Sequence, residues 1–423
     1  MSDKKVTPSE FEEILKTGNA FKNFVFLTSN GAAPGSYCGL SKYDFLAGIN
    51  SLDSVEATSN SLEQFHQFTE RNKGKWMFGF LAYDLKNEIE NLNSKHTDKL
   101  NFPTLHFFVP QIVMTSQAGV LKIIDQQAQT IDEFKADDVE LRQLKQSYPL
   151  ELTPRFSSSE YMDAVAHLKN FLQNGDIYEV TFCQEFYNDA AEINPFETFI
   201  KLGIKSRAPM SCFYKKDNHH IISSSPERFL CKRGTKLYSQ PIKGTAARSA
   251  SAEEDDYIKE QLLQSEKERA ENMMIVDLVR NDLSRIAQPG SVHVDELLGL
   301  YSFKTVHQLI STISCEVSSS ISFTDILKAT FPMGSMTGAP KISAMKLIDE
   351  FEKTRRGAFS GSVGYIDPEG DFDFNVIIRT ILYNAQRRYL SVQAGGAITI
   401  QSDAGSEYEE SLLKAKAMID VLG

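Results

Sequence analysis

The chain has 423 residues, of which 41% are hydrophobic and 24% charged, and its formal net charge is −11 at pH 7. These values are typical of a globular protein and exclude a mostly disordered one. The acidic balance argues against a surface that binds nucleic acid or an anionic membrane, so an anionic substrate would need a local pocket of cations or a metal ion.

The chain start and the cysteines indicate a cytoplasmic protein without a membrane anchor. The segment 1–5 leads into polar residues with no apolar stretch, so no signal peptide is expected. No apolar run approaches the roughly 18 residues of a membrane span. The five cysteines are scattered and never spaced as C-x-x-C, which predicts reduced core thiols rather than disulfides or a zinc site.

The first 150 residues predict several strands before a polar stretch. Hydrophobic patterning predicts a short helix at 8–18. It also predicts four strands, at 24–27, 75–84, 105–110 and 111–114. From residue 125 to 154 the chain is polar and charged and shows no strand alternation, although 137–147 fits a helix. We therefore divide the chain into an N-terminal region, 1–150, and a C-terminal region, 151–423.

The C-terminal region mixes helices and strands irregularly. Helices are predicted at 157–172, 252–285, 304–313 and 407–421. Strands are predicted at 178–186, 220–224, 229–231, 291–294, 361–366, 373–382 and 389–393. Hairpin-like pairs within this order favour an α+β fold with largely antiparallel sheets over a doubly wound parallel sheet.

A lysine in a proline- and glycine-bracketed turn is the first candidate for chemistry. The segment P-I-K-G-T places Lys243 beside Gly244, which lets the backbone come close to a ligand. A surface charge is the ordinary explanation for an isolated lysine. Because dense polar and glycine-rich clusters accompany it, we interpret Lys243 as a nucleophile in a magnesium-assisted enzyme acting on a small carboxylate.

Carboxylates near this lysine and in two helices are the second group of candidates. Glu227, in S-P-E-R-F, either pairs with Arg228 or acts as a general acid if burial raises its pKa. Glu271 lies in the apolar part of a helix, where a magnesium ligand explains it better than core packing does. Matching carboxylates in the last helix are Glu407 and Glu410, for which solvated helix-start glutamates are the alternative.

Stretches of small residues suggest exposed backbone donors. The segment 332–341 resembles an anion-binding loop at a helix start, but it lacks the spacing of a Walker A motif. Segment 394–397, A-G-G-A, fits either close strand packing or a wall of N–H donors. Arg379 provides a planar fork suited to a carboxylate.

Together these motifs resemble the chorismate-utilising enzymes. The motifs are P-I-K-G-T, S-P-E-R-F, A-E-N-M-M-I-V-D-L-V-R-N-D-L, F-P-M-G-S-M-T-G-A-P-K and E-Y-E-E-S. The resemblance is dense over 155–420 and weaker over the first 110 residues. It implies an α+β fold in which two large, mostly antiparallel sheets pack as a sandwich with helices outside. It also implies that the N-terminal region contributes to the same sandwich.

The resemblance also implies roles for individual residues. Glu271 and Glu410, with Glu407 nearby, are similar to Mg²⁺ ligands that hold the ring carboxylate of chorismate. Glu227 is similar to the acid that protonates the departing C4 hydroxyl. The positions that match substrate contacts are Gly244, Thr245, Arg379, Gly395, Gly396 and Lys414.

Lys243 selects a branch of the family. Anthranilate synthases have alanine here, whereas the branch that makes 4-amino-4-deoxychorismate from chorismate and ammonia has a lysine that attacks C2. This chemistry leads to 4-aminobenzoate and folate. It needs a neutral lysine, so we expect desolvation to lower the pKa of Lys243.

Two departures from the family pattern accompany this assignment. Glu179 stands where amine-adding relatives have glutamine and water-adding relatives have lysine. Two roles are left open for it: a hydrogen bond to Lys243 that alters the pKa of the lysine, or a reduced affinity for an anion. Gln308 stands where anthranilate synthases have a histidine, with His307 one place earlier, which disfavours the anthranilate branch.

No segment resembles a glutaminase, so ammonia is expected from a separate glutamine amidotransferase subunit. Two alternatives stay open: an anthranilate synthase component I with an atypical lysine, and a non-catalytic chorismate-binding subunit that regulates an amidotransferase.

Overall fold

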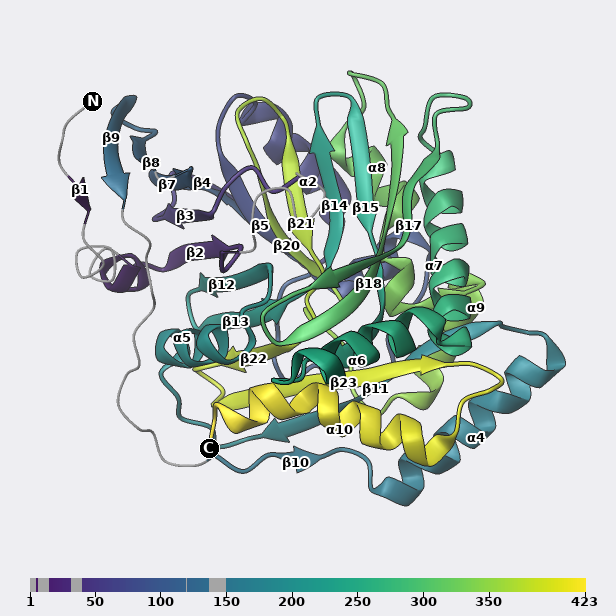
Figure 1. Cartoon of the computed structure of the whole chain (residues 1–423). Coiled ribbons are helices and arrows are strands. Elements are labelled where there is room, and N and C mark those ends of the chain that lie inside the picture. Colours follow the sequence, from purple (N-terminus) through teal and green to yellow (C-terminus); the bar gives the residue numbers. More distant parts are fainter. Residues whose placement is uncertain (1–4, 7–14, 32–39, 119, 137–149) are drawn as a thin grey trace.

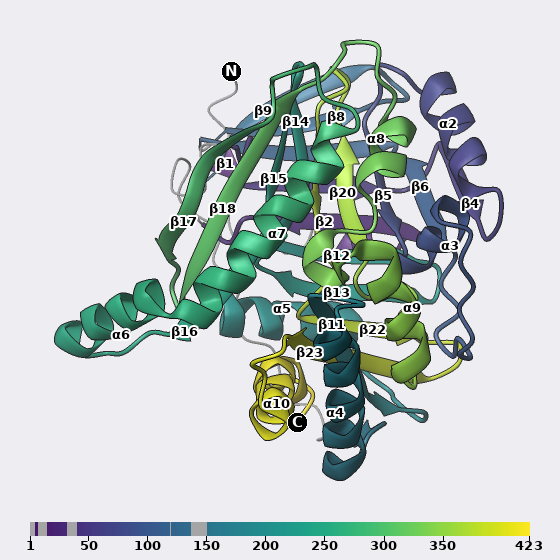
Figure 2. The same cartoon turned by 90° about the vertical axis from the view of Figure 1, so that its right-hand side faces the viewer.

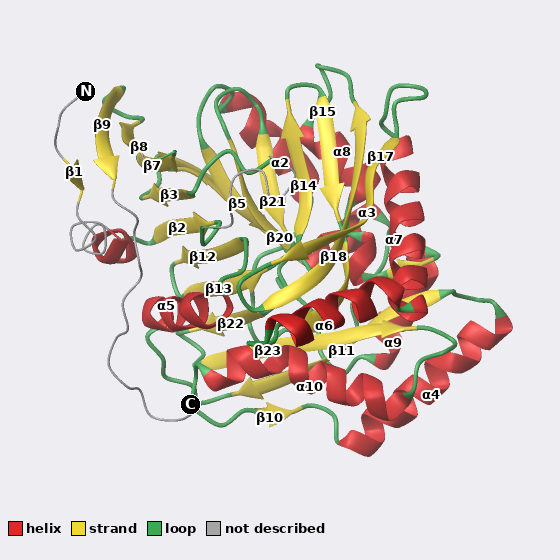
Figure 3. Cartoon of the chain, viewed as in Figure 1, coloured by secondary structure: helices red, strands yellow, loops and turns green. Residues whose placement is uncertain are grey.

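The computed structural model describes residues 5–6, 15–31, 40–118, 120–136 and 150–423 (Figure 1). Within these residues the strands form two sheets, of 13 and 10 strands, and helices lie around them (Figure 3). Every described strand pairing is antiparallel except that of β1 with β9. The fold is therefore α+β with two large antiparallel sheets, as the sequence predicted.

The larger sheet runs from one edge to the other through both regions of the chain. Its order is β1 (Lys5–Val6), β9 (Thr130–Ala136), β8 (Val120–Asp125), β7 (Ile112–Gln117), β3 (Phe45–Ile49), β2 (Asn23–Thr28), β12 (Met210–Lys216), β13 (His219–Ser225), β22 (Thr380–Asn384), β23 (Tyr389–Ile398), β11 (Glu179–Asn188) and β10 (Thr153–Pro154). The short β19 (Gly338–Ala339) also pairs with β11.

The smaller sheet likewise combines strands of both regions. Its order is β16 (Ile242–Ala247), β18 (Val306–Glu316), β15 (Lys236–Gln240), β14 (Arg228–Arg233), β21 (Phe372–Asn375), β20 (Ser362–Ile366), β5 (Met77–Leu81), β6 (Leu105–Val109) and β4 (Asp53–Ala57), and β17 (His293–Ser302) pairs with β18. Strands before residue 137 thus share both sheets with strands after residue 150.

Helices cover the outer faces of both sheets (Figure 2). Their bounds are α2 (Ser61–Arg71), α3 (Lys86–Ile89), α4 (Ser158–Asn174), α5 (Pro195–Ser206), α6 (Ala252–Gln264), α7 (Glu266–Ser284), α8 (Phe323–Thr330), α9 (Lys341–Phe351) and α10 (Ala404–Asp420), with 3₁₀ turns η1 (Tyr83–Leu85) and η2 (Gly334–Met336). Helices α5 and α10 pack on β13 and β23 of the larger sheet, and α7 packs on β16 and β18 of the smaller one. None of the described helices is long and apolar enough to cross a membrane.

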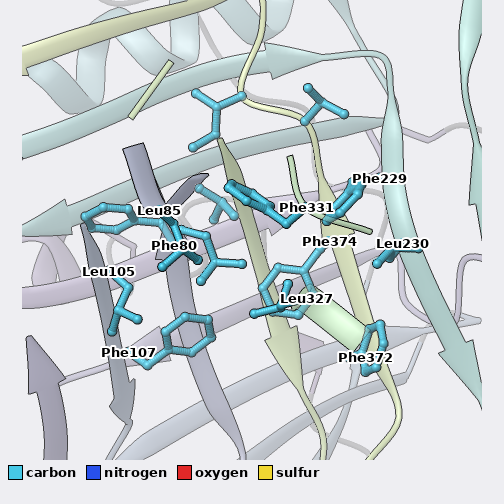
Figure 4. Packing of buried hydrophobic residues seen from close by; sticks show 14 of the residues in the cluster. Phe80, Leu85, Leu105, Phe107, Phe229, Leu230, Leu327, Phe331, Phe372 and Phe374 are labelled. Atoms are coloured by element: carbon cyan, nitrogen blue, oxygen red, sulfur yellow. The ribbon is translucent and has the colours of Figure 1, made fainter. Parts of the chain in front are cut away.

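The core forms because strand side chains alternate between two faces. In β2, Val25 belongs to an apolar cluster that fills the space between the sheets and continues on the face of the smaller sheet under α2 and α8, whereas Phe24 and Phe26 belong to the cluster under α5. Figure 4 shows part of the first cluster, in which the rings of Phe107 and Phe374 lie 6.1 Å apart. Both sheets therefore bury both faces over much of their area.

Three element predictions are wrong. Segment 304–313 was expected to be a helix but lies in strand β18, where its β-branched residues are buried between neighbouring strands. The single helix expected over 252–285 is two helices, because the Ser265 side chain accepts from the Glu268 N–H and starts α7. The strand expected over 373–382 breaks between β21 and β22, where Arg379 has a φ of 52°.

Other predictions for the N-terminal region met mixed outcomes. Residues 130–136 form strand β9, although their polar composition had predicted no strand. The strands expected at 24–27, 105–110 and 111–114 are β2, β6 and β7. Most of the predicted helix 8–18 and all of the predicted helix 137–147 lie outside the described residues.

A buried ion pair inside the smaller sheet supports one stability prediction. Arg228 is 1% exposed, and its Nε and Nη2 lie 2.8 and 3.1 Å from the two carboxylate oxygens of Asp373. Replacing Asp373 with alanine leaves the guanidinium buried without this counter-charge, so we expect a loss of about 3–5 kcal/mol in the free energy of unfolding. Chemical denaturation measures this loss. As a control, Asp277→Ala removes a partner of Arg280 from an exposed pair and should change stability little; equal small losses in both variants would contradict the prediction.

Candidate active site

A cavity of about 500 Å³ is lined by residues of β16, β23, α7 and α10. Ten of the sequence-predicted site residues line it: Glu227, Lys243, Gly244, Thr245, Glu271, Arg379, Gly395, Gly396, Glu410 and Lys414. The eleventh, Glu407, is 1% exposed and lies behind Gly396, which has no room for a side chain beside its carboxylate. The structure thus brings together residues that are up to 187 positions apart in the chain, from Glu227 to Lys414.

Local backbone geometry directs Lys243 into this cavity. The register of β16 against β18 shifts between Ile242 and Thr245, and Gly244 within the shift has a φ of +85°. A residue with a Cβ is strained in this conformation, which explains the glycine. The Lys243 side chain is 11% exposed, and its Nζ donates to Oε1 of Glu179 over 2.7 Å.

The charge state of Lys243 differs from the sequence prediction. Burial alone would lower the pKa of its ammonium, as expected. However, the carboxylates of Glu179, Glu271 and Glu227 outweigh burial, and the pKa is raised above its usual 10.5. The prediction of a lowered pKa is therefore wrong for the protein without substrate, because it rested on desolvation alone, whereas the hydrogen bond to Glu179 that the sequence left open is formed.

Glu227 has the raised pKa that a general acid at this position needs. It is 4% exposed at the end of the loop before β14, and burial raises the pKa of its carboxyl to about 7, against the opposing charges of Lys243 and Lys414. The alternative partner Arg228 is instead engaged with Asp373. A carboxyl group with this pKa holds a proton near neutral pH and can donate it.

Two glutamates from different helices have oxygens suited to a cation. Glu271 Oε1 and Glu407 Oε2 are buried without a hydrogen-bond partner, and Lys267 Nζ lies 3.9 Å from Glu271 and 3.1 Å from Glu407. Glu410 lines the same cavity, and its Oε1 lies 2.6 Å from Lys414 Nζ. Among the described residues no three acidic, His or Cys side chains are already gathered closely enough to hold a metal ion. The donor set nevertheless fits Mg²⁺, which prefers a few carboxylates plus oxygens of the substrate and water.

Two cations and two glycines form another part of the lining. Arg379 is half-buried, and desolvation lowers the pKa of its guanidinium to about 10; its Nη1 donates to the Lys414 carbonyl over 3.2 Å. Lys414 Nζ donates to the Gly395 carbonyl over 2.9 Å. A Cβ on Gly395 would collide with the backbone of Phe182 on β11, so close strand packing explains this glycine.

Sequence reasoning missed several lining residues. These are Thr181, Lys267, Glu268, Gln393 and Leu413, whereas the lining residues Ser335 and Met336 belong to the segment 332–341 already singled out from the sequence. Lys267 and Glu268 lie four and three residues before Glu271 on the same helix, and this spacing places them on one face.

Gln308 lines the cavity, whereas His307 points to the other face of β18 and its Nε2 lies 2.8 Å from Asp255. His307 therefore does not replace the histidine of the anthranilate branch.

Gly396 provides a test of Glu407 and Glu410 as candidate magnesium ligands. A Cβ at this position would come within 2.8 Å of Glu407 Oε2 and 3.4 Å of Glu410 Oε1, both of which are ends of side chains. In Gly396→Ala the Glu407 carboxylate must move, so we expect Mg²⁺ to bind about 10–100-fold more weakly, the usual effect of disturbing groups around a metal. Calorimetry with Mg²⁺ measures this affinity, with Glu350→Gln, which removes an exposed carboxylate of α9, as the control. An unchanged affinity of Gly396→Ala for Mg²⁺ would contradict the assignment of these glutamates as its ligands.

Comparisons with known proteins agree with this geometry. The family described as chorismate binding enzyme matches residues 26–420. The chain is 35% identical to aminodeoxychorismate synthase component 1 of Klebsiella aerogenes over 355 residues, covering 81% of this chain and 76% of that protein. It is 43% identical to a probable chloroplastic aminodeoxychorismate synthase of rice over 270 residues, covering 63% of this chain but only 30% of the rice protein.

A solved structure shares the fold. The crystal structure of anthranilate synthase component I from Streptococcus pneumoniae matches with a TM-score of 0.72 and 27% identity, covering 88% of this chain and 91% of that one. Because the family match spans nearly the whole chain, this protein belongs to the chorismate binding enzymes.

Proposed function

We propose that this protein converts chorismate and ammonia to 4-amino-4-deoxychorismate through a covalent adduct between Lys243 and C2 of chorismate. The observation that carries the proposal is Lys243 itself, which projects from β16 into the cavity beside the proton-holding Glu227. Bacterial relatives named aminodeoxychorismate synthase component 1 support it at 32–37% identity.

The residues around the cavity suit a small dicarboxylate. Arg379 and Lys414 provide positive charge, and Gly395 and Gly396 line the same cavity. Lys243 attacks C2, the ring double bonds shift, and the C4 hydroxyl leaves as water with the proton of Glu227. Ammonia then adds at C4 and expels the lysine, so two easier displacements replace one difficult step.

A magnesium ion is part of this proposal. Glu271, Glu407 and Glu410 would hold it, because two of them carry buried oxygens without hydrogen-bond partners. When bound, the ion would supply Lewis-acid polarisation and a position for the ring carboxylate. The residues of this chain orient the substrate and move the protons.

Ammonia would come from a separate glutamine amidotransferase subunit, which the name component 1 of the bacterial relatives supports. The described cysteines, Cys183, Cys212, Cys231 and Cys315, are buried and free, which fits the expected cytoplasmic location.

The anthranilate synthase alternative has less support. Its pyruvate elimination needs a base where this chain has Gln308, and His307 is turned toward Asp255. The lining of the cavity does not support the alternative of a non-catalytic chorismate-binding subunit. All four candidate catalytic and metal-binding residues are present there: Lys243, Glu227, Glu271 and Glu410.

The product spectrum tests these alternatives. We expect purified protein with chorismate, Mg²⁺ and ammonium to form 4-amino-4-deoxychorismate, identified by liquid chromatography and mass spectrometry. Anthranilate as the sole product would overturn the proposal in favour of the anthranilate branch. Chorismate binding in calorimetry without turnover would instead support the regulatory subunit.

A further inference from the structure

Glu179 contacts Nζ of Lys243, the reacting atom of the candidate nucleophile. Its Oε1 accepts the hydrogen bond from Lys243 Nζ at 2.7 Å, and its carboxylate is fully buried. Among the described residues it is the one carboxylate within ion-pairing distance of this Nζ. Its second oxygen, Oε2, is buried and has no hydrogen-bond partner. The carboxylate thus has free lone pairs and no other cation bound to it.

The backbone around Glu179 is held firmly. Glu179 begins β11 and pairs with Ala339 of β19, while the N–H groups of Tyr178 and Thr181 donate to the carbonyls of Ala339 and Thr337. Gly338, with a φ of +140°, lies so close that a Cβ there would collide with the Glu179 carbonyl. Two strands that approach this tightly fix the direction of the Glu179 side chain toward β16.

An ammonium group has no lone pair, so Lys243 must lose a proton before it can attack carbon. In the protein without substrate the surrounding carboxylates favour the charged form of the lysine. The other charged groups that line the cavity with it are Glu227 before β14, Lys267, Glu268 and Glu271 of α7, Arg379 before β22, and Glu410 and Lys414 of α10. None of these forms a hydrogen bond with Nζ in the described structure, so none can take its proton directly.

We propose that Glu179 is the catalytic base for Lys243, taking a proton from its ammonium before the attack and returning it after the lysine is released. This inference rests on the proposed function. In the first step one proton passes from Nζ to Oε1, leaving a neutral amine and a carboxylic acid. The amine forms the N–C2 bond while the C4–O bond breaks and Glu227 supplies the proton of the departing water. When ammonia forms the N–C4 bond, the N–C2 bond breaks, and the freed amine recovers its proton from Glu179.

The test compares adduct formation in the wild-type protein, Glu179→Gln and Glu179→Asp. Each protein is mixed with chorismate and Mg²⁺ without ammonium, quenched, and analysed by intact-protein mass spectrometry for the mass of chorismate less one water. We expect Glu179→Gln to form the adduct about 100-fold more slowly, at the low end of the range for loss of a general base. Its rate should rise about tenfold per pH unit below pH 7, where the wild-type rate is level, because solvent must then remove the proton. Glu179→Asp, which keeps a carboxylate, should be slower than wild type but retain the level profile.

A second measurement separates a base from a merely electrostatic neighbour. Trinitrobenzenesulfonate labels neutral amines, and peptide mass spectrometry follows labelling of Lys243, with the exposed Lys346 as reference. Removing the Glu179 charge lowers the pKa of Lys243, so Glu179→Gln should be labelled faster at neutral pH although it forms the adduct more slowly. If labelling and adduct formation both accelerate, Glu179 only keeps the lysine charged, and the inference is wrong. An adduct rate and pH profile identical to those of the wild type would also overturn it. Absence of any adduct in the wild-type protein would instead overturn the proposed function.

Discussion

Lys243→Ala is expected to lower kcat for amination of chorismate by about three orders of magnitude, within the range observed when a covalent nucleophile is removed. Alanine has no amine to attack C2, so ammonia would have to displace the C4 hydroxyl without the intermediate. The shortened side chain also leaves Glu179 buried without its partner. Steady-state assays with ammonium measure the loss, and quenched mass spectrometry should find no adduct.

The control for this variant is Lys346→Ala on the exposed face of α9, which should keep wild-type turnover. If Lys243→Ala turns over chorismate at the wild-type rate and yields the same product, the covalent role of this lysine is wrong. If its product becomes anthranilate, the side chain at this position decides between direct attack at C2 and the two-step route.

Glu227→Gln should lower kcat by about 10²–10³-fold, because the leaving hydroxyl loses its proton donor. The wild-type pH profile carries a second signature. Burial raises the pKa of Glu227 to about 7, so the acid form is present below this pH and is lost as the pH rises through it. Wild-type kcat should therefore fall above about pH 7, and Glu227→Gln should lack this descending limb.

Glu350→Gln on the exposed part of α9 is the matched control and should leave both kcat and the pH profile unchanged. A descending limb that persists in Glu227→Gln would assign the titration to another group and remove Glu227 from the role of acid.

The sequence alone determined much of the candidate site. Short motifs around Lys243, Glu227, Glu271 and Glu410 are local, and their resemblance to one family predicted a shared cavity that the fold provides. The α+β class followed in the same way from hairpin-like strands and irregular helices. Local signals such as the Ser157 capping box, which begins α4, were also readable without a structure.

The tertiary structure decided what depends on contacts between distant segments. Segment 306–316 has a pattern compatible with a short buried helix, and only its pairing with β15, β16 and β17 makes it a strand. The pKa of Lys243 was predicted to shift in the wrong direction, because the shift depends on a carboxylate 64 positions earlier in the chain. A pKa reflects burial and neighbouring charges together, and a linear sequence shows neither how deeply a lysine is buried nor which carboxylate faces it.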